Sequence, residues 1–182
     1  MHGLPKSTPS LQLRHFVPGD ALAAMALNAE RSTRHWLPSH VYATADEAQS
    51  RLKYLISSYK DPGHPRLGPY VLAVAEARTL RLLGHVGFSP LDNEVEVSYA
   101  IAESARGQGY GAESLACACD WIASTFSVSR VLAITAVENI PSRRILEHVS
   151  FAHVQNEDMR FQGVRRAVSR YCWTAPTQRS GA

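Results

Sequence analysis

The feature that most constrains the fold is a glycine-rich segment between an alternating stretch and a helical one. Residues 104–115 read SARGQGYGAESL, in which three glycines alternate with other residues and Arg106 stands directly before them. The preceding run, Glu94–Ile101, alternates apolar and polar residues and predicts a strand. The residues from about Gly109 to Thr125 carry apolar side chains at helical spacing. The chain is therefore expected to pass from strand to loop to helix at these glycines.

A loop of this kind is suited to binding an anion. The first N–H groups of a helix have no backbone partner, and the helix dipole is positive at that end. Glycine lets the backbone approach a ligand and adopt positive φ, and Arg106 adds charge-assisted hydrogen-bond donors. These properties indicate a phosphate or pyrophosphate site. The alternative is a glycine-rich connection that binds nothing.

The rest of the chain predicts a mixed sheet with helices on its faces. The N-terminal part reads as a strand at 11–16, a helix at 21–30 capped by Asp20, and a helix at about 44–58. Three short runs, 70–76, 82–88 and 94–101, predict an antiparallel meander. Residues 131–137 are apolar on both faces, as in a central parallel strand. A short helix to about His148 and a closing pair of strands at 151–155 and 164–173 complete the order.

This order gives an α/β (α+β) fold class, with a mostly antiparallel sheet of about seven strands and about four helices. A length of 182 residues suits one domain. We expect a flexible N-terminal arm at 1–10, the folded domain at 11–174 and a C-terminal tail at 175–182.

Composition and charge narrow the partners. The formal net charge is +3, which fits an anionic small molecule as well as nucleic acid. No basic run supports nucleic-acid binding, and no apolar stretch reaches the ~20 residues of a membrane span. Three irregularly spaced cysteines indicate a reducing compartment, and the N-terminus lacks a signal peptide's apolar run. We expect a cytoplasmic protein without a metal, since no zinc-like histidine spacing occurs.

The string Gly107–Ala112 fits the dinucleotide-binding fingerprint G-x-G-x-x-G/A. That fingerprint opens a repeating β-α-β series, whereas an antiparallel meander precedes it here. The sequence context therefore argues against a dinucleotide site. A P-loop is excluded as well, because its Lys-Ser or Lys-Thr pair is missing.

The same stretch, Arg106–Gly111, resembles the R/Q-x-x-G-x-G/A motif of the GNAT superfamily of acyl-CoA-dependent N-acetyltransferases. Further stretches are similar to the subgroup that includes the ribosomal-protein N-terminal (alanine) acetyltransferases. They are the strand Glu96–Ile101, the N-x-x-S-x-x-x-x-E segment Asn139–Glu147, the opening Leu13–Phe16 with Pro18–Asp20, and Trp36–Pro38. The resemblance covers nearly all of residues 11–173.

The resemblance implies acetyl-CoA as the cofactor and assigns residues to it. The pyrophosphate would be held by Arg106, Gly107, Gln108, Gly109, Tyr110, Gly111 and Ala112. The backbone of Tyr99, Ala100 and Ile101 would pair with the pantetheine amides, and a backbone N–H near Tyr99 would bind the oxyanion. Asn139 would bond the pantetheine arm, although capping the next helix is an alternative role.

Two side chains are candidates for catalysis. Glu96 lies on the polar face of its predicted strand, and the resemblance implies that it is the general base; the alternative is a solvated strand residue. Many superfamily members place a tyrosine in the last helix to protonate the thiolate, but none occurs between Asn139 and Phe151. Ser142 is the nearest hydroxyl and is the candidate general acid or sulfur-side hydrogen-bond donor.

Two departures and one connection bear on specificity. The subgroup usually has glycine where Ser98 and Ser150 stand. Ser98 lies beside the implied reaction centre, and Ser150 ends a helix where glycine would adopt the left-handed conformation most easily. Trp36 and Tyr42 lie in the connection that walls the acceptor cleft in relatives.

The sequence therefore predicts an acetyl-CoA-dependent N-acetyltransferase that transfers the acetyl group directly to a primary amine. A protein or peptide N-terminal α-amine is the first candidate acceptor. A small-molecule amine, such as an amino acid, polyamine or antibiotic, is the second, and a non-catalytic CoA-binding module is the alternative to an enzyme. We expect a monomer or a homodimer that binds neither nucleic acid nor membrane.

Overall fold

The structure, a computed structural model, describes residues 3–60 and 63–176. These residues contain an eight-stranded sheet in the order β1-β2-β3-β4-β5-β6-β8-β7. The strands are β1 (Lys6–Ser7), β2 (Leu11–Arg14), β3 (Tyr70–Glu76), β4 (Leu82–Leu91), β5 (Glu94–Ile101), β6 (Arg130–Ala136), β7 (Ala152–Phe161) and β8 (Val164–Thr174). The β5–β6 pair is parallel and the other neighbours are antiparallel.

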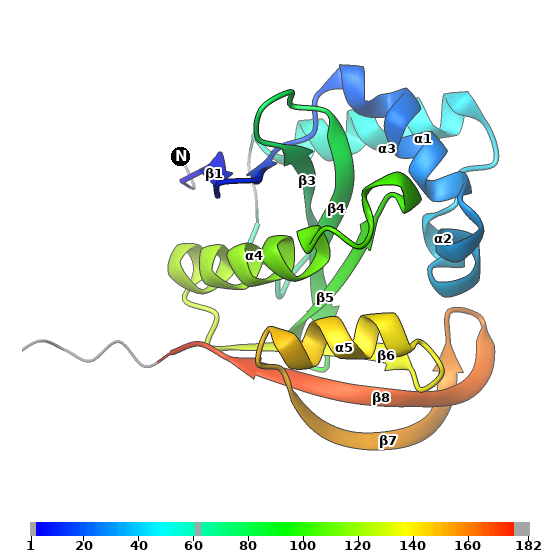
Figure 1. Cartoon of the computed structure of the whole chain (residues 1–182), viewed down its shortest axis with the longest axis vertical. Coiled ribbons are helices and arrows are strands. Elements are labelled where there is room, and N and C mark those ends of the chain that lie inside the picture. Colours follow the sequence, from blue (N-terminus) through cyan, green and yellow to red (C-terminus); the bar gives the residue numbers. More distant parts are fainter. Residues whose placement is uncertain (1–2, 61–62, 177–182) are drawn as a thin grey trace, which may run out of the picture.

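Helices cover both faces of this sheet (Figure 1). They are α1 (Ala21–Ala29), α2 (Arg31–Trp36), α3 (Ala45–Ser58), α4 (Tyr110–Phe126) and α5 (Ile140–His148). The main core lies under α4, where Leu115, Trp121 and Ile122 are fully buried against the sheet. A smaller core on the opposite face joins α1 and α3 through Ala24 and Leu52.

The predicted fold class is confirmed, including the antiparallel meander and the parallel strand after α4. Two elements are additional, β1 and α2, and β7 continues to Phe161, beyond the predicted end of that strand. In α2 only Thr33 is buried, so no apolar stripe marks it. Strand β7 is an edge strand with no fully buried residue, so alternation does not mark its length either.

The two predicted helix starts had different outcomes. The prediction at α3 is confirmed, because Thr44 Oγ1 accepts a hydrogen bond from the Glu47 N–H at 3.1 Å. The cap at α1 is wrong, because Asp20 makes no such bond to the helix. Its carboxylate instead binds the Arg14 guanidinium at 2.7 and 2.8 Å and the Val17 N–H. A two-pronged pair between opposite charges is stronger than a single bond from the carboxylate to a helix N–H, and Asp20 is itself already in a helical conformation.

The chain termini are described in part. Lys6–Ser7 of the expected arm pairs with β2, whereas residues 1–2 and residues 177–182 of the expected tail lie outside the described residues. The proposed division into arm, domain and tail stays a prediction. Ser150, which follows α5, has a φ of +64° and adopts the left-handed conformation that the subgroup's glycine would take.

The feature that positions the site is the separation of β5 from β6. Within the described chain, the two strands pair only at Val95–Val131 and Glu96–Leu132. Beyond these residues they diverge, and the remaining edge of β5 has no strand beside it on that side. The glycine-rich segment follows β5 directly, and α5 follows β6. The opening between the strands therefore lies between the first turns of α4 and α5.

Candidate active site

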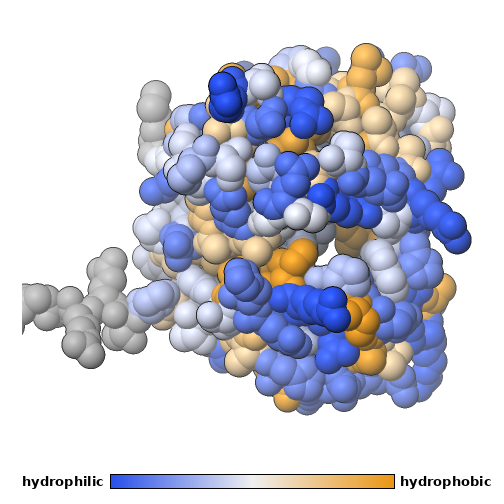
Figure 2. Space-filling view, in the orientation of Figure 1, coloured by the Kyte–Doolittle hydropathy of each residue, from blue (hydrophilic) through white to orange (hydrophobic). Residues whose placement is uncertain are grey.

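A cavity of about 690 Å³ occupies this opening. Such a volume is typical of small-molecule and cofactor sites. One part, which we call the loop half, is lined by β5, the glycine-rich segment, and the first turns of α4 and α5. The other, the bridge half, is lined by α2, the segment after it and the β7–β8 turn. In Figure 2 the face is hollowed at this place, with apolar side chains at the edge of the hollow.

The structure brings nearly all of the predicted site residues to this cavity. Its walls include Glu96, Tyr99, Ala100, Ile101, Arg106, Gly107, Gly109, Tyr110, Gly111, Ala112, Asn139 and Ser142. Gln108 is the exception, because it is exposed and does not line the cavity. The roles assigned to these side chains stay predictions.

The glycine-rich segment has the backbone that an anion site needs. Gly107 and Gly109 have φ values of +75° and +83°, and a Cβ at either position would meet nothing within 4 Å. Their backbone is therefore both left-handed and open to a ligand. Gly111 is different, because a Cβ there would lie 3.0 Å from Ile145 Cδ1. This glycine lets α4 approach α5, so the residues present fit a pyrophosphate at the start of α4.

Arg106 has protein partners of its own. Its Nε donates to the Ile101 carbonyl at 2.9 Å, and its Nη2 donates to Ser32 Oγ at 2.7 Å and to a Glu30 carboxylate oxygen at 3.2 Å. The guanidinium thus ties the end of β5 to the junction of α1 and α2. Its Nη1 lies 3.6 Å from a Glu103 carboxylate oxygen, and the side chain remains 42% exposed at the rim of the cavity.

Glu96 lies on β5 where the strands begin to separate. Burial raises its pKa to about 7, with the charge of Arg170 acting to lower the pKa and that of Asp92 to raise it. Arg170 is itself paired with Glu157 and with Asp92 at 3.5 Å. A carboxylate with this pKa can accept and return a proton near neutral pH.

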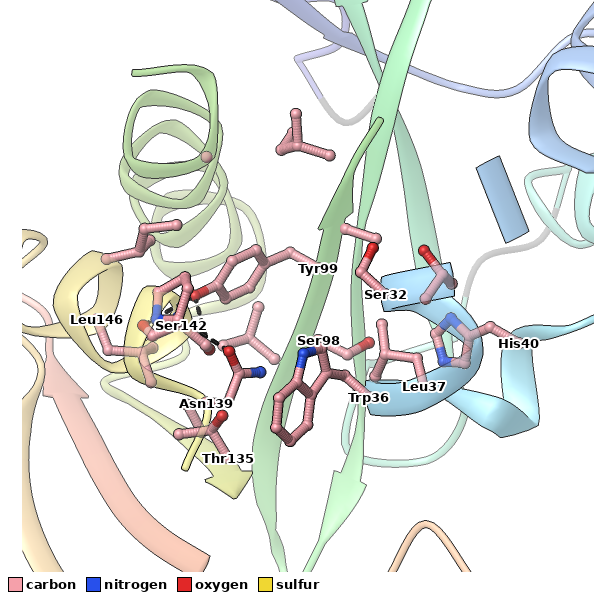
Figure 3. Close-up of a pocket in the computed structure, with 18 of the residues that line it drawn as sticks. Ser32, Trp36, Leu37, His40, Ser98, Tyr99, Thr135, Asn139, Ser142 and Leu146 are labelled. Atoms are coloured by element: carbon pink, nitrogen blue, oxygen red, sulfur yellow. Dashed lines mark hydrogen bonds between the residues drawn. The ribbon is translucent and has the colours of Figure 1, made fainter. Parts of the chain in front are cut away.

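Tyr99 and Ser142 meet across the loop half (Figure 3). The Tyr99 hydroxyl lies 3.0 Å from Ser142 Oγ and 3.2 Å from the Ser142 carbonyl oxygen, and its single hydrogen can go to either acceptor. Burial raises the pKa of Tyr99 to about 12. No role for this side chain follows from the sequence. The available signal was a phenol on the otherwise apolar face of β5, but its partner lies 43 residues away.

Asn139 begins α5 as its cap. Its Oδ1 accepts a hydrogen bond from the Ser142 N–H at 3.3 Å. The capping role is therefore confirmed. Contact with the pantetheine arm stays a prediction, and the side chain faces the cavity from which such contact would come (Figure 3).

The bridge half contains residues that the sequence did not identify. Ser39 Oγ donates to Gln162 Oε1 at 2.8 Å, which joins the segment after α2 to the β7–β8 turn. Trp36 lines the cavity as expected for this connection, whereas Tyr42 does not. The Arg166 guanidinium carbon lies 5.7 Å from the centre of the Trp36 ring, a cation–π geometry.

A histidine pair supports the same half. His40 lines the cavity, and its Nδ1 lies 3.2 Å from Nε2 of the buried His85. Burial lowers the pKa of both rings, and that of His85 falls to about 3. Both rings are therefore neutral at pH 7.

Within residues 3–60 and 63–176, none of the helices combines the length and apolar character that crossing a membrane requires. Cys117, Cys119 and Cys172 are free thiols. Cys119 is fully buried in the main core, as expected for a small apolar residue.

Solved structures with the same fold are acetyltransferases. The chain is similar to a ribosomal-protein-S5-alanine acetyltransferase from Vibrio fischeri, with a TM-score of 0.75, 18% identity and coverage of 94% of this chain and 96% of that one. It is similar to RimJ from Mycobacterium smegmatis in complex with CoA-disulfide, with a TM-score of 0.75, 18% identity and coverage of 95% of this chain and 89% of that one. It also resembles RimL, a ribosomal L7/L12 α-N-protein acetyltransferase in complex with coenzyme A. The TM-score is 0.76, the identity is 17%, and the match covers 93% of this chain and 96% of that one.

Sequence comparison supplies the family. A search of curated protein sequences gives no match. Residues 10–152, more than half of the chain, match the description "Acetyltransferase (GNAT) domain". The chain therefore belongs to the GNAT acetyltransferase family: it is an acyltransferase, and its cofactor is acetyl-CoA.

Proposed function

We propose that this acetyltransferase modifies the α-amine at the N-terminus of a protein or peptide. The observation that carries the proposal is the carboxylate of Glu96, which faces the cavity and has a pKa raised to about 7. An α-amine has a pKa of roughly 8, whereas a lysine amine has a pKa near 10.4. The pKa of an α-amine is close to that of Glu96, so proton transfer to Glu96 is nearly balanced. For a lysine amine the pKa is higher by about three units, and the transfer is unfavourable.

The relatives support this choice of acceptor. RimL is named as an α-N-protein acetyltransferase, and the Vibrio fischeri protein is named for a ribosomal-protein alanine. At 17–18% identity these structures establish the fold, so the acceptor rests on the Glu96 argument and on the resemblance in sequence.

In the proposed reaction, acetyl-CoA supplies an activated acetyl group. Glu96 takes the proton from the attacking amine, directly or through one water. From Tyr99 to Ile101, the edge of β5 opposite β4 has no described strand paired with it, so it offers hydrogen bonds to an amide-bearing ligand and an N–H to the oxyanion. The segment from Arg106 to Ala112 holds the pyrophosphate, and Ser142 donates a hydrogen bond at the sulfur.

A small-molecule amine is the second candidate, because the Ser39–Gln162 hydrogen bond admits it as readily as a peptide end. This contact closes one side of the bridge half and so selects a narrow acceptor. An extended peptide end and an unbranched small amine both meet that requirement. A non-catalytic CoA-binding module would have no need of a proton acceptor poised near pH 7.

The test is a paired acetylation assay with acetyl-CoA. One peptide has a free α-amine and arginine in place of every lysine, and its partner has a blocked N-terminus and one free lysine. We expect mass spectrometry to find acetylation of the first peptide and little of the second. Turnover of small amines alone would replace the proposal with the second candidate, and binding of acetyl-CoA without turnover on any amine would overturn it.

We also propose that the protein acts in a reducing compartment and that a single protomer is active. Three free thiols support a reducing environment such as the cytoplasm. The described chain carries both halves of the cavity on one protomer, which supports activity as a monomer and leaves a homodimer compatible with it.

A further inference from the structure

The contact between Tyr99 and Ser142 joins two elements that otherwise diverge. Tyr99 stands on β5 beyond its last pairing with β6, and Ser142 lies in the first turn of α5. Both residues line the cavity. Figure 3 shows the tyrosine pointing from β5 across the opening and ending beside the serine. Two hydroxyl groups from opposite walls thus meet inside the cavity, where they can act on a bound substrate.

Counting donors shows what the pair can do. The phenol of Tyr99 carries one hydrogen, and its pKa of about 12 keeps it protonated throughout the neutral range. The Ser142 carbonyl belongs to α5, where the helix supplies an N–H to it from the next turn. When the phenol donates to Ser142 Oγ, the serine hydrogen is free to point into the cavity. Without the phenol, a helical serine turns its hydrogen back to a carbonyl of the preceding turn.

We propose that Tyr99 is a positioning residue for acetyl transfer: its hydroxyl holds Ser142 Oγ so that the serine hydrogen points toward the sulfur of CoA. This inference rests on the proposed role of Ser142. During transfer the amine nitrogen forms the new bond to the acetyl carbon, and the carbon–sulfur bond breaks with its electron pair on sulfur. The amine proton goes to Glu96, which later releases it to solvent, while sulfur accepts the serine hydrogen bond and then takes a proton from solvent.

The arrangement accounts for the absence of a tyrosine between Asn139 and Phe151. A phenol on α5 would reach the sulfur from the helix itself. Here the phenol comes from the opposite wall and reaches the same helix turn through the serine. The hydroxyl of an alcohol is a weaker acid than a thiol, so Ser142 stabilises the leaving sulfur as a donor without surrendering its proton.

The kinetic test compares Tyr99→Phe, Ser142→Ala and the double variant. We expect each single change to lower kcat about 10-fold with little effect on the KM for acetyl-CoA, and the double variant to lose no more than either. Tyr54→Phe is the matched control, because Tyr54 is 69% exposed on α3. Additive losses in the double variant, or full activity of Tyr99→Phe, would overturn the inference.

A binding test separates positioning from structural support. At pH 9, where most of the CoA thiol (pKa ~8.5) is ionised, the wild-type protein should bind CoA about 10-fold more tightly than desulfo-CoA. Tyr99→Phe should lose this preference and keep its affinity for desulfo-CoA. A purely structural tyrosine would weaken both ligands equally, which would contradict the proposal.

The two tests also separate this inference from the proposed acceptor. The CoA preference needs no acceptor, so it stands even if α-amine peptides are not acetylated. If the wild-type protein acetylates peptides but shows no preference for CoA, the present inference is wrong and the acceptor proposal survives. If Tyr99→Phe does not fold, Tyr99→Leu takes its place in both tests, because leucine also removes the hydroxyl and keeps an apolar side chain at this position.

Discussion

The two halves of the cavity are assembled in different ways. The loop half comes largely from two continuous stretches, β5 through the start of α4 and the first turns of α5. Its main groups are backbone atoms, and its shape depends on local conformations such as the positive φ of Gly107 and Gly109. The bridge half joins α2, the segment after it and the β7–β8 turn, and side-chain contacts hold these pieces together.

This difference indicates what each half can change. A backbone site tolerates replacement of most side chains but not of its glycines. A site made from side chains on separate loops changes its shape with single substitutions and leaves the scaffold intact. We therefore expect acetyl-CoA binding to depend on the loop half and acceptor choice to depend on the bridge half. The following predictions test that division.

The largest effect is expected from Glu96→Gln, at the boundary of the two halves. Removing a general base costs on the order of 100-fold in kcat/KM, while the affinity for acetyl-CoA should not change. Steady-state kinetics and a binding titration measure the two quantities. Glu94→Gln is the matched control on the same face of β5, because Glu94 is paired with Arg66 and Arg130 outside the cavity. Equal losses in the two variants would exclude a specific role for Glu96.

The pH dependence of kcat/KM, calculated on the concentration of unprotonated amine, should show the raised pKa of Glu96. The base acts when ionised, so activity falls as pH drops through a pKa of about 7. Between pH 8 and 5.5 the decrease in the ionised fraction is about 30-fold, whereas an unshifted carboxyl would lose about one tenth. Arg170→Met removes a charge that lowers this pKa and should move the acid limb to higher pH. An acid limb near pH 4.5 would contradict the assignment.

The contribution of Glu96 to folding stability should decrease as pH rises, whereas its contribution to activity increases. The folded-state pKa of Glu96 is raised, so its contribution to stability is complete below the unfolded value of 4.5 and is lost as pH rises through 7. Glu96→Gln should therefore raise Tm more at pH 8 than at pH 4.5. A thermal melt at both pH values also verifies that the inactive variant is folded.

A smaller effect is expected in the loop half from Gly109→Ala. The left-handed backbone costs a residue with a Cβ about 1–2 kcal/mol, so we expect acetyl-CoA to bind roughly 10-fold more weakly, with KM for the acceptor nearly constant. Isothermal titration measures the affinity. Gly68→Ala is the control, because that glycine has open space and no positive φ. Unchanged affinity in Gly109→Ala would show that the loop conformation does not determine cofactor binding.

The smallest effect is expected from Ser39→Ala in the bridge half. The change removes one hydrogen bond to Gln162, which is worth about 1 kcal/mol. KM for the acceptor should change about 5-fold, and bulkier amines should gain relative to narrow ones, with the affinity for acetyl-CoA unaffected. Competition between two amines in one reaction measures the selectivity. Ser50→Ala, exposed on α3, should alter neither quantity, and a loss of acetyl-CoA affinity in Ser39→Ala would refute the division.

The same division explains what the sequence could predict. The meander, the parallel strand and the loop half follow from local patterns, since alternation, glycine position and helix caps all act within a few residues. The Ser39–Gln162 and Tyr99–Ser142 contacts span 123 and 43 residues, and no local pattern encodes such a pairing. The failure at Asp20 has a different origin, because Arg14 lies only six residues earlier, at the end of β2, and takes the carboxylate in place of the helix N–H groups.

The short pairing of β5 with β6 also bears on which strand edges are open to other chains. Unpaired strand edges on the outside of a protein are templates on which strands of other chains can add, and they promote aggregation. Beyond Glu96 and Leu132 this sheet has two such edges, but they face each other inside the molecule, between α4 and α5. A strand from another chain cannot lie along them without separating the two helices. The chain thus keeps free backbone groups available to a ligand where they do not seed fibres.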